Sequence, residues 1–239
     1  MSNVIAGFVV GLLVGFTGVG GGSLMTPLLV LLFGVAPQIA VGTDLLVAAT
    51  NKAVGGFVHG LRGAIDWRVA CRLWIGSVPA ACGTLYFIRQ MQPRADFRSV
   101  LMHLLGWALL VTGAVLILQS RLHQHRTVRR IYDSRLNLAQ PAFTVLAGAL
   151  VGALVTITSI GAGALTAVML VYLYPYRLTP PKLVATDLVH AIPVSLIAGL
   201  GHLRLGNVDY SLLELLLIGS IPGVLVGSRL SHFVPGRIV

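Results

Sequence analysis

The chain repeats itself. Residues 41–87 align with residues 184–230 at a constant offset of 143 positions and without a gap, and 14 of these 47 aligned positions are identical. Most of the other positions exchange one apolar residue for another. The identical residues of the first copy include Val41, Thr43, Asp44, Leu45, Gly56, His59, Gly63, Asp66, Gly76, Ser77 and Pro79. Internal duplication in a very hydrophobic chain is typical of secondary transporters.

The composition fixes the class of protein. Of the 239 residues, 56% are apolar and only 10% are charged, whereas a soluble domain carries about 25% charged residues. Several apolar runs approach the roughly 20 residues that span a bilayer. We therefore expect an all-α, polytopic membrane protein. The net charge of +10 does not indicate nucleic-acid binding, because the cations lie mostly in short loops without interleaved aromatic residues.

The apolar pattern predicts seven transmembrane helices in two pseudo-symmetric repeats. The first and fifth are too long for simple spans, and each is interrupted by a glycine-containing stretch, at 18–22 and 159–163. Each repeat thus begins with a broken helix, which either crosses the membrane or folds back as a hairpin. Irregular backbone survives at membrane depth only where protein or a water-filled cavity satisfies it. The spans are expected near 4–33, 38–58, 68–88, 98–119, 141–174, 181–202 and 211–230.

The chain divides at its most basic segment. Repeat 1 covers residues 1–119 with four spans, a basic loop covers 120–139, and repeat 2 covers 140–239 with three spans. The arginine-rich loop is expected on the cytoplasmic side by the positive-inside rule. The sequence leaves open the orientation of the termini and whether a counterpart of the span at 98–119 follows the second repeat.

Two acidic residues occupy equivalent positions in the repeats. Asp44 follows Thr43, and Asp187 follows Thr186. Carboxylates in membrane segments are costly and usually face a cavity or a partner, so we expect Asp44 and Asp187 to couple transport to a proton or cation. The alternative is that they cap the helices on which they lie.

Glycines in the two interruptions are candidates for substrate contact. Half-helix N-termini attract anions, and glycine lets a substrate approach the backbone. The alternative is close helix packing through small residues. The predicted substrate-binding residues are Gly20, Gly21, Gly22, Thr43, Lys52, Gly161, Gly163 and Thr186.

Lys52 breaks the symmetry, because its counterpart in the second repeat is Ser195. It lies about 12 Å along the helix from Asp44, too far for direct pairing. Lys52 therefore either faces an anionic substrate, balances another acid such as Asp187, or extends to the membrane surface.

Nothing in the sequence indicates catalysis. It contains no nucleophile elbow, phosphate-binding loop or zinc-ligand spacing, so we expect no catalytic residue, metal site or cofactor. Asp66 and Asp209 are expected to cap the helices that follow them.

Small residues recur at fixed spacing in both repeats. The first repeat contains Gly11–x3–Gly15–x2–Gly18–x–Gly20–Gly21–Gly22, Pro27, Ala40–Val41–Gly42–Thr43, His59–x3–Gly63–x2–Asp66–Trp67 and Gly76–Ser77–x–Pro79. The second repeat contains Gly148–x3–Gly152, Ala185–Thr186–Asp187 and Gly219–Ser220–Ile221–Pro222–Gly223. This pattern resembles the TauE/SafE family of sulfite exporter-like membrane permeases, although the second broken helix departs from it, with Leu170 where the first repeat has Pro27. The resemblance implies transport of a small sulfur-containing anion such as sulfite, thiosulfate or an organosulfonate.

We therefore expect a proton-coupled secondary transporter, multi-pass in the inner (cell) membrane. Its expected partners are a small anionic substrate and the lipid bilayer, with no nucleic acid; a homodimer is also considered. The alternative is a non-transporting scaffold or partner subunit of a redox complex. Transport predicts a polar cavity at the membrane midplane that both repeats line, whereas a scaffold predicts a dry interior there and a large external patch.

Overall fold

The computed structural model describes residues 2–17, 22–60, 65–92, 96–123, 134–161, 163–174 and 177–231. Within these ranges every regular element is a helix, as the composition predicts. The helices are α1 (Ser2–Thr17), α2 (Gly22–Leu31), α3 (Pro37–Gly60), α4 (Trp67–Met91), α5 (Phe97–His123), α6 (Ser134–Thr158), α7 (Ala164–Leu173), α8 (Pro180–Arg204) and α9 (Tyr210–Ser231).

Several of these helices are long and apolar enough to cross a bilayer. In the described part of the chain, four segments satisfy both conditions: Trp67–Met91, Ala139–Thr158, Pro180–Arg204 and Tyr210–Leu230. Shorter apolar helices lie at Asn3–Phe16 and Ser99–Ala114. Large apolar side chains such as Trp107 and Ile75 face outward, as a lipid-facing surface requires. The molecule is thus a multi-pass membrane protein; the count of seven spans stays a prediction.

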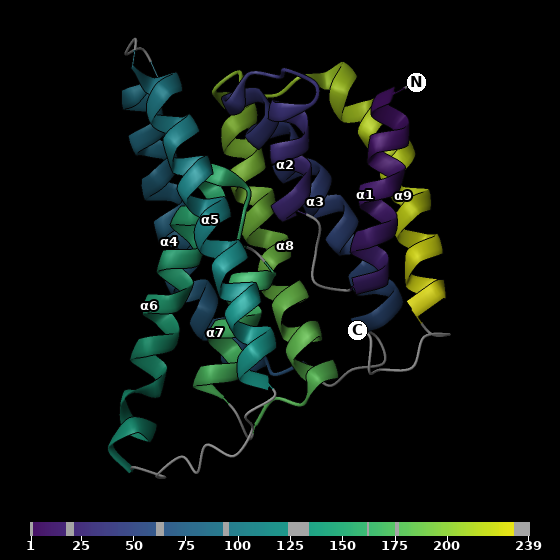
Figure 1. Cartoon of the computed structure of the whole chain (residues 1–239). Helices are drawn as coiled ribbons and strands as arrows, with labels where there is room; N and C mark the ends of the chain where they lie inside the picture. The colour runs from purple at the N-terminus through teal and green to yellow at the C-terminus, as the bar shows by residue number, and fades with distance from the viewer. Residues whose placement is uncertain are drawn as a thin grey trace.

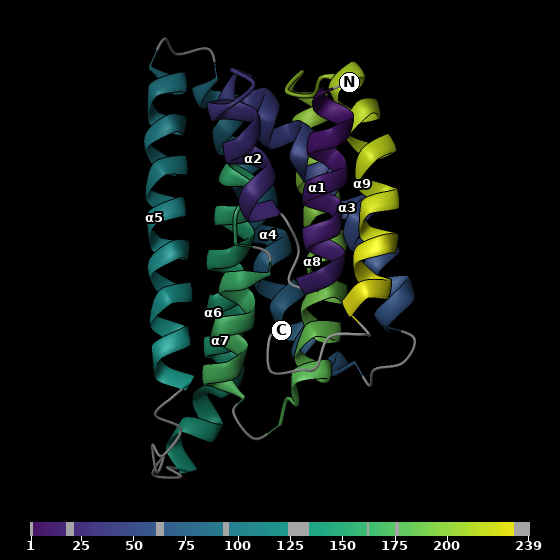
Figure 2. The same ribbon diagram turned by 45° about the vertical axis from the view of Figure 1, so that its right-hand side comes forward.

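The two interrupted helices fold back as hairpins. With the N-terminus drawn at the top, α1 runs downward, and α2 runs back to the upper end, where α3 begins (Figure 1, Figure 2). The opposite arrangement holds in the second half, where α6 runs upward and α7 returns to the lower end, where α8 begins. The structure therefore favours the hairpin alternative, with the two hairpins entering from opposite ends.

The first helix of each half packs closely on a helix of the other half, α1 on α9 and α6 on α4. A Cβ atom on Gly7 of α1 would collide with the backbone of Leu216 on α9, and one on Gly148 of α6 would collide with that of Leu73 on α4. Leu73 and Leu216 are themselves 143 positions apart, whereas Gly7 and Gly148 are 141 apart. The small residues of these helices thus allow close packing.

The reverse contacts show the same correspondence. A Cβ on Gly219 would meet the backbone of Val4, and a Cβ on Gly76 would meet that of Val145. Val4 and Val145 again differ by 141 positions. The same contact therefore occurs twice, each time between elements of different halves, and the Gly–Ser pairs of the sequence motif are explained by helix packing.

The side chains of Asp66 and Asp209 cap the N-termini of α4 and α9. Asp66 Oδ1 accepts a hydrogen bond from the Val69 N–H at 3.3 Å, and Asp209 Oδ1 accepts one from the Leu212 N–H at 3.0 Å. These contacts confirm the predicted capping roles. At the expected basic loop, α5 continues to His123 and α6 begins at Ser134. Both helices therefore extend into the segment 120–139, of which residues 124–133 lie outside the described ranges.

Candidate functional site

Lys52 and three ionisable side chains that interact with its charge lie buried on α3 and α8, in the interior of the helix bundle. Asp44 is 1% exposed and Lys52 2% on α3, while Asp187 is 2% exposed and His190 is fully buried on α8. A charge inside a membrane protein is tolerated only where it is paired or hydrogen-bonded, or faces a cavity. The interior therefore contains titratable side chains from both halves, which favours transport over a dry scaffold.

The acids are not helix caps. Asp44 is the eighth residue of α3, and Asp187 is the eighth residue of α8, so both lie beyond the first turn, where a cap would act. The capping alternative for these two residues is wrong, because each helix begins about two turns before its Thr–Asp pair, near the start that the apolar pattern predicts.

Each acid instead lies beside a threonine of the hairpin in its own half. Thr26 on α2 donates its hydroxyl to Asp44 Oδ2 at 2.6 Å, and Thr166 on α7 neighbours Asp187. Thr26 and Thr166 lie in the short return helices of the two hairpins. The returning helices thus bring hydroxyl groups to carboxylates that the packing has removed from water.

Lys52 joins the two halves electrostatically. Its ammonium interacts with the charges of Asp187 and Asp44, and His190 also lies within reach of its charge. Unlike charges in a low-dielectric interior interact strongly. One cation therefore stands among titratable groups from both halves.

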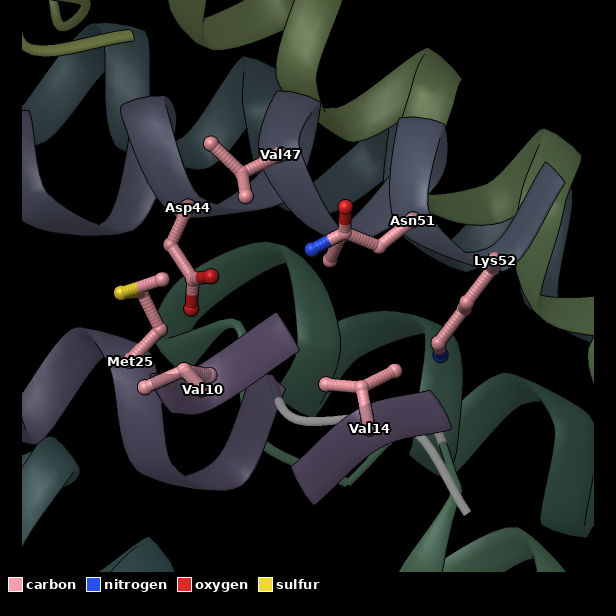
Figure 3. Close-up of a pocket in the computed structure, with 8 residues that line it drawn as sticks. Val10, Val14, Met25, Asp44, Val47, Asn51 and Lys52 are labelled. Atoms are coloured by element: carbon pink, nitrogen blue, oxygen red, sulfur yellow. The ribbon is translucent and has the colours of Figure 1, made fainter. Parts of the chain in front are cut away.

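A small pocket opens beside this cluster. Its volume is about 10 Å³, room for about one water molecule and far below the roughly 300–1,000 Å³ of pockets for drug-sized ligands. Asp44 and Lys52 extend into it from α3, toward the side of α1 and α2 (Figure 3). The lining residues are Val10, Val14, Met25, Asp44, Val47, Ala48, Asn51 and Lys52, all from the first half of the chain. A cavity lined by both repeats therefore stays a prediction.

The break between α6 and α7 needs glycine. Gly161 has φ +113° and Gly163 has φ +133°, in the region that L side chains rarely adopt. Ser159 also has a positive φ, +59°. No side chain caps the N-terminus of α7, which begins after Gly163. The non-helical backbone predicted here is confirmed for residues 159–161 and 163, and it leaves the first N–H groups of α7 without a side-chain acceptor.

The other predicted site residues have different surroundings. Thr43 Oγ1 accepts a hydrogen bond from the Asp209 N–H at 3.2 Å, and Thr186 Oγ1 accepts one from the Asp66 N–H at 3.1 Å. These hydroxyls therefore link the two halves; their role as substrate ligands stays a prediction. Gly20 and Gly21 lie outside the described residues, and Gly22 is the first residue of α2.

Sequence reasoning missed several polar residues around the acids. Thr26 and Thr166 could have been found, because each follows a predicted break by a few residues. Ser159 lies within the predicted break, and its hydroxyl approaches Asp44 without hydrogen-bond geometry. His190 is one helical turn after Asp187, but its counterpart is Val47, so the repeat comparison gave no signal for it.

An ion pair stabilises the lower end of the bundle. Arg177 donates to both carboxylate oxygens of Asp66, at 2.5 and 2.8 Å. Burial alone would raise the pKa of Asp66, but hydrogen bonds from Arg177 and the Val69 N–H, with the charges of Arg177 and Lys182, hold this pKa below its usual range. The pair connects the start of α4 to the segment before α8. Among the described residues, no group of histidine, cysteine and acidic side chains has the arrangement of a metal site.

Buried charges between inverted hairpins in an apolar helix bundle define a multi-pass membrane transporter. The family model described as "Sulfite exporter TauE/SafE" matches residues 3–239. The chain belongs to this family, which confirms the resemblance of its motifs.

The chain is also similar to proteins described as probable membrane transporters. It is 37% identical to YjnA of Bacillus subtilis, over 97% of this chain and 90% of that protein. It is 28% identical to YdhB of the same organism, over 98% of this chain and 91% of that protein. It is 27% identical to MJ0441 of Methanocaldococcus jannaschii, over 98% and 86%. No solved structure matches the chain.

Proposed function

We propose that this protein is a proton-coupled secondary transporter of a small sulfur-containing anion, such as sulfite, thiosulfate or an organosulfonate, across the cytoplasmic membrane. The observation that carries the proposal is Lys52, a buried cation beside a small pocket and within reach of acids from both halves. The family description, which names a sulfite exporter, supports the substrate class.

The anion would bind between the hairpins. Lys52 supplies a counter-charge, and the uncapped N-terminus of α7 supplies N–H dipoles that favour negative charge. Gly161 and Gly163 let the backbone turn sharply there. Together these groups replace part of the hydration that an anion loses when it leaves water.

Proton coupling follows from the balance of charges. When Lys52, Asp44 and Asp187 are all ionised, their sum is negative and repels an anion. Protonation of the carboxylates makes the sum positive, so it favours the anion. Binding of the anion and binding of a proton then promote each other, because linkage between two ligands is reciprocal.

The charged connections support an orientation in the membrane. Three connections join helices at the lower end of the bundle: α3–α4, α5–α6 and α7–α8 (Figure 1). We propose that this end faces the cytoplasm, because cytoplasmic loops carry an excess of lysine and arginine. The N-terminus would then lie outside. In sequence, the lower connections contain Arg62, Arg126, Arg129, Arg130 and Arg177, and the upper ones contain Arg94.

Flux measurement tests the proposal. Purified protein in proteoliposomes is given ³⁵S-labelled thiosulfate or sulfite outside, with and without an inward proton gradient. We expect protein-dependent accumulation that the gradient increases and an uncoupler abolishes. A variant carrying Lys52→Met serves as the inactive control. Accumulation equal to that of empty liposomes for sulfite, thiosulfate and a sulfonate would overturn the proposed substrate class.

A further inference from the structure

His190 is placed to bind a ligand through one ring nitrogen. Its Nε2 lies 3.0 Å from Ser77 Oγ on α4, and its ring is fully buried. Trp74 Nε1, one turn before Ser77, donates to the His190 carbonyl oxygen at 3.1 Å. The backbone and one nitrogen of His190 are therefore held by α4.

The other ring nitrogen is unsatisfied. His190 Nδ1 is buried and has no hydrogen-bond partner among the described residues. A buried polar atom without a partner costs roughly 1–3 kcal/mol, so such an atom indicates a missing ligand or water. Asp187 Oδ1 and Ser159 Oγ are unsatisfied in the same way. Asp187 lies one turn before His190 on α8, so the two side chains share a helix face.

The face of α3 that corresponds to the Asp187 and His190 face of α8 lines the pocket. Val47, the counterpart of His190 at the offset of 143, is a pocket residue, as are Asp44 and Lys52 (Figure 3). His190 also lies within reach of the Lys52 charge. The second half therefore presents a polar ring at the position where the first half presents an apolar side chain.

We propose that His190 donates a hydrogen bond from Nδ1 to an oxygen of the transported oxyanion, with Ser77 as its positioning residue. When the Ser77 hydroxyl donates to Nε2, the neutral ring carries its proton on Nδ1 and is a donor there. A neighbouring cation disfavours a second positive charge, so Lys52 supports the neutral ring. This inference rests on the proposed function, because it requires an oxyanion between the two halves.

Two substitutions of His190 separate the roles of its two ring nitrogens. The amide of asparagine lies near the position of Nδ1, whereas the amide of glutamine lies near that of Nε2. His190→Asn therefore keeps a donor toward the ligand and loses the Ser77 contact. His190→Gln keeps the Ser77 contact and loses the donor. Thermal unfolding in nanodiscs selects the conditions in which both variants are folded.

Thiosulfate and sulfite binding are then measured by calorimetry at fixed pH. We expect His190→Gln to weaken binding by about tenfold or more, as for loss of a hydrogen bond to a charged group. His190→Asn should retain affinity within about threefold of the unchanged protein. Wild-type affinity in His190→Gln, or equal losses in both variants, would overturn the role of Nδ1. Absence of binding by the unchanged protein would overturn the proposed substrate class as well.

Discussion

Thr43 Oγ1 accepts a hydrogen bond from the backbone N–H of Asp209 at 3.2 Å. The equivalent pair, Thr186 and Asp66, makes the same bond at 3.1 Å. In both cases a threonine on α3 or α8 accepts a hydrogen bond from the residue that precedes a helix of the other half, α9 or α4. We infer that these bonds set the relative position of the two halves around the buried acids.

Replacing Thr43 should therefore loosen the assembly of the halves. Thr43→Val keeps the branched shape but leaves the Asp209 N–H without its acceptor, which should cost about 1 kcal/mol of stability. Thr50→Val is the matched control, because the Thr50 hydroxyl donates to the Leu46 carbonyl oxygen within the same helix. Thermal unfolding in detergent compares them. A loss no larger than that of the control would contradict the linking role.

Lys52 should be needed for anion binding. Lys52→Met removes the counter-charge and should weaken thiosulfate binding by about tenfold or more, as expected when a buried charge loses its partner. Lys52→Arg should preserve part of the affinity. Arg68→Met removes an exposed cation and is the control. Calorimetric titration checks all three, and unchanged affinity in Lys52→Met would exclude a substrate role for this residue.

The structural alternative for Lys52 has its own test. If Lys52 only balances Asp187, the double variant Lys52→Met, Asp187→Asn should recover both stability and anion binding. If Lys52 contacts the anion, stability recovers and binding does not. Thermal unfolding and thiosulfate titration of the same samples distinguish these results.

The ion pair at the lower end should make stability depend on acid pH. Because the folded pKa of Asp66 is depressed, its contribution is fully present above the unfolded pKa of about 3.9. It is lost as the pH falls through the lower, folded value. Arg177 is 40% exposed, so screening limits the contribution to about 1 kcal/mol.

Arg177→Met tests this contribution. The variant should be less stable than the unchanged protein at neutral pH, and the difference should shrink as the pH falls below the unfolded pKa of about 3.9 and through the lower, folded value. Unfolding curves across this range give the measurement. A difference that stays constant down to the lowest pH would show that Arg177 stabilises the fold by packing alone.

The proposed orientation can be read by labelling. In a background with Cys71→Ser and Cys82→Ser, Leu32→Cys places a thiol at an exposed position of the upper end and Thr179→Cys places one at the lower end. A membrane-impermeant maleimide added to intact cells should label Leu32→Cys and reach Thr179→Cys only after permeabilisation. The opposite pattern would place the arginine-rich connection outside.

Much of this fold follows from local sequence. The apolar runs predict the helices, and the glycines of the interruptions predict the breaks, since Gly161 and Gly163 adopt φ values that other residues avoid. Whether a broken helix crosses or folds back depends on packing between distant segments. In this protein that packing is between Gly7 on α1 and Leu216 on α9, which no local pattern encodes.

The candidate site was only partly visible in the sequence. Asp44, Asp187 and Lys52 stood out because charges are rare in apolar helices. The neighbouring residues Thr26, Thr166 and Ser159 did not stand out, because threonine and serine are common in apolar helices and carry no periodic signal. The sequence places His190 one helical turn after Asp187, but a role for it could be inferred only from its unsatisfied Nδ1 and its contact with Ser77 together.

The central claim is that anion binding takes up a proton at the buried acids. Thiosulfate is the suitable ligand, because it does not titrate near neutral pH. Asp44→Asn and Asp187→Asn should each reduce the proton uptake that accompanies its binding. If uptake is unchanged in both, the acids do not carry the coupled proton.

The most direct measurement is calorimetric titration of the unchanged protein with thiosulfate in buffers of different ionisation enthalpy. The slope of the observed heat against the buffer enthalpy gives the protons bound with each anion. We predict a positive uptake approaching about one proton at a pH where the acids are ionised in the free protein. Binding of thiosulfate with no proton exchange at any pH from about 5 to 9 would contradict the account.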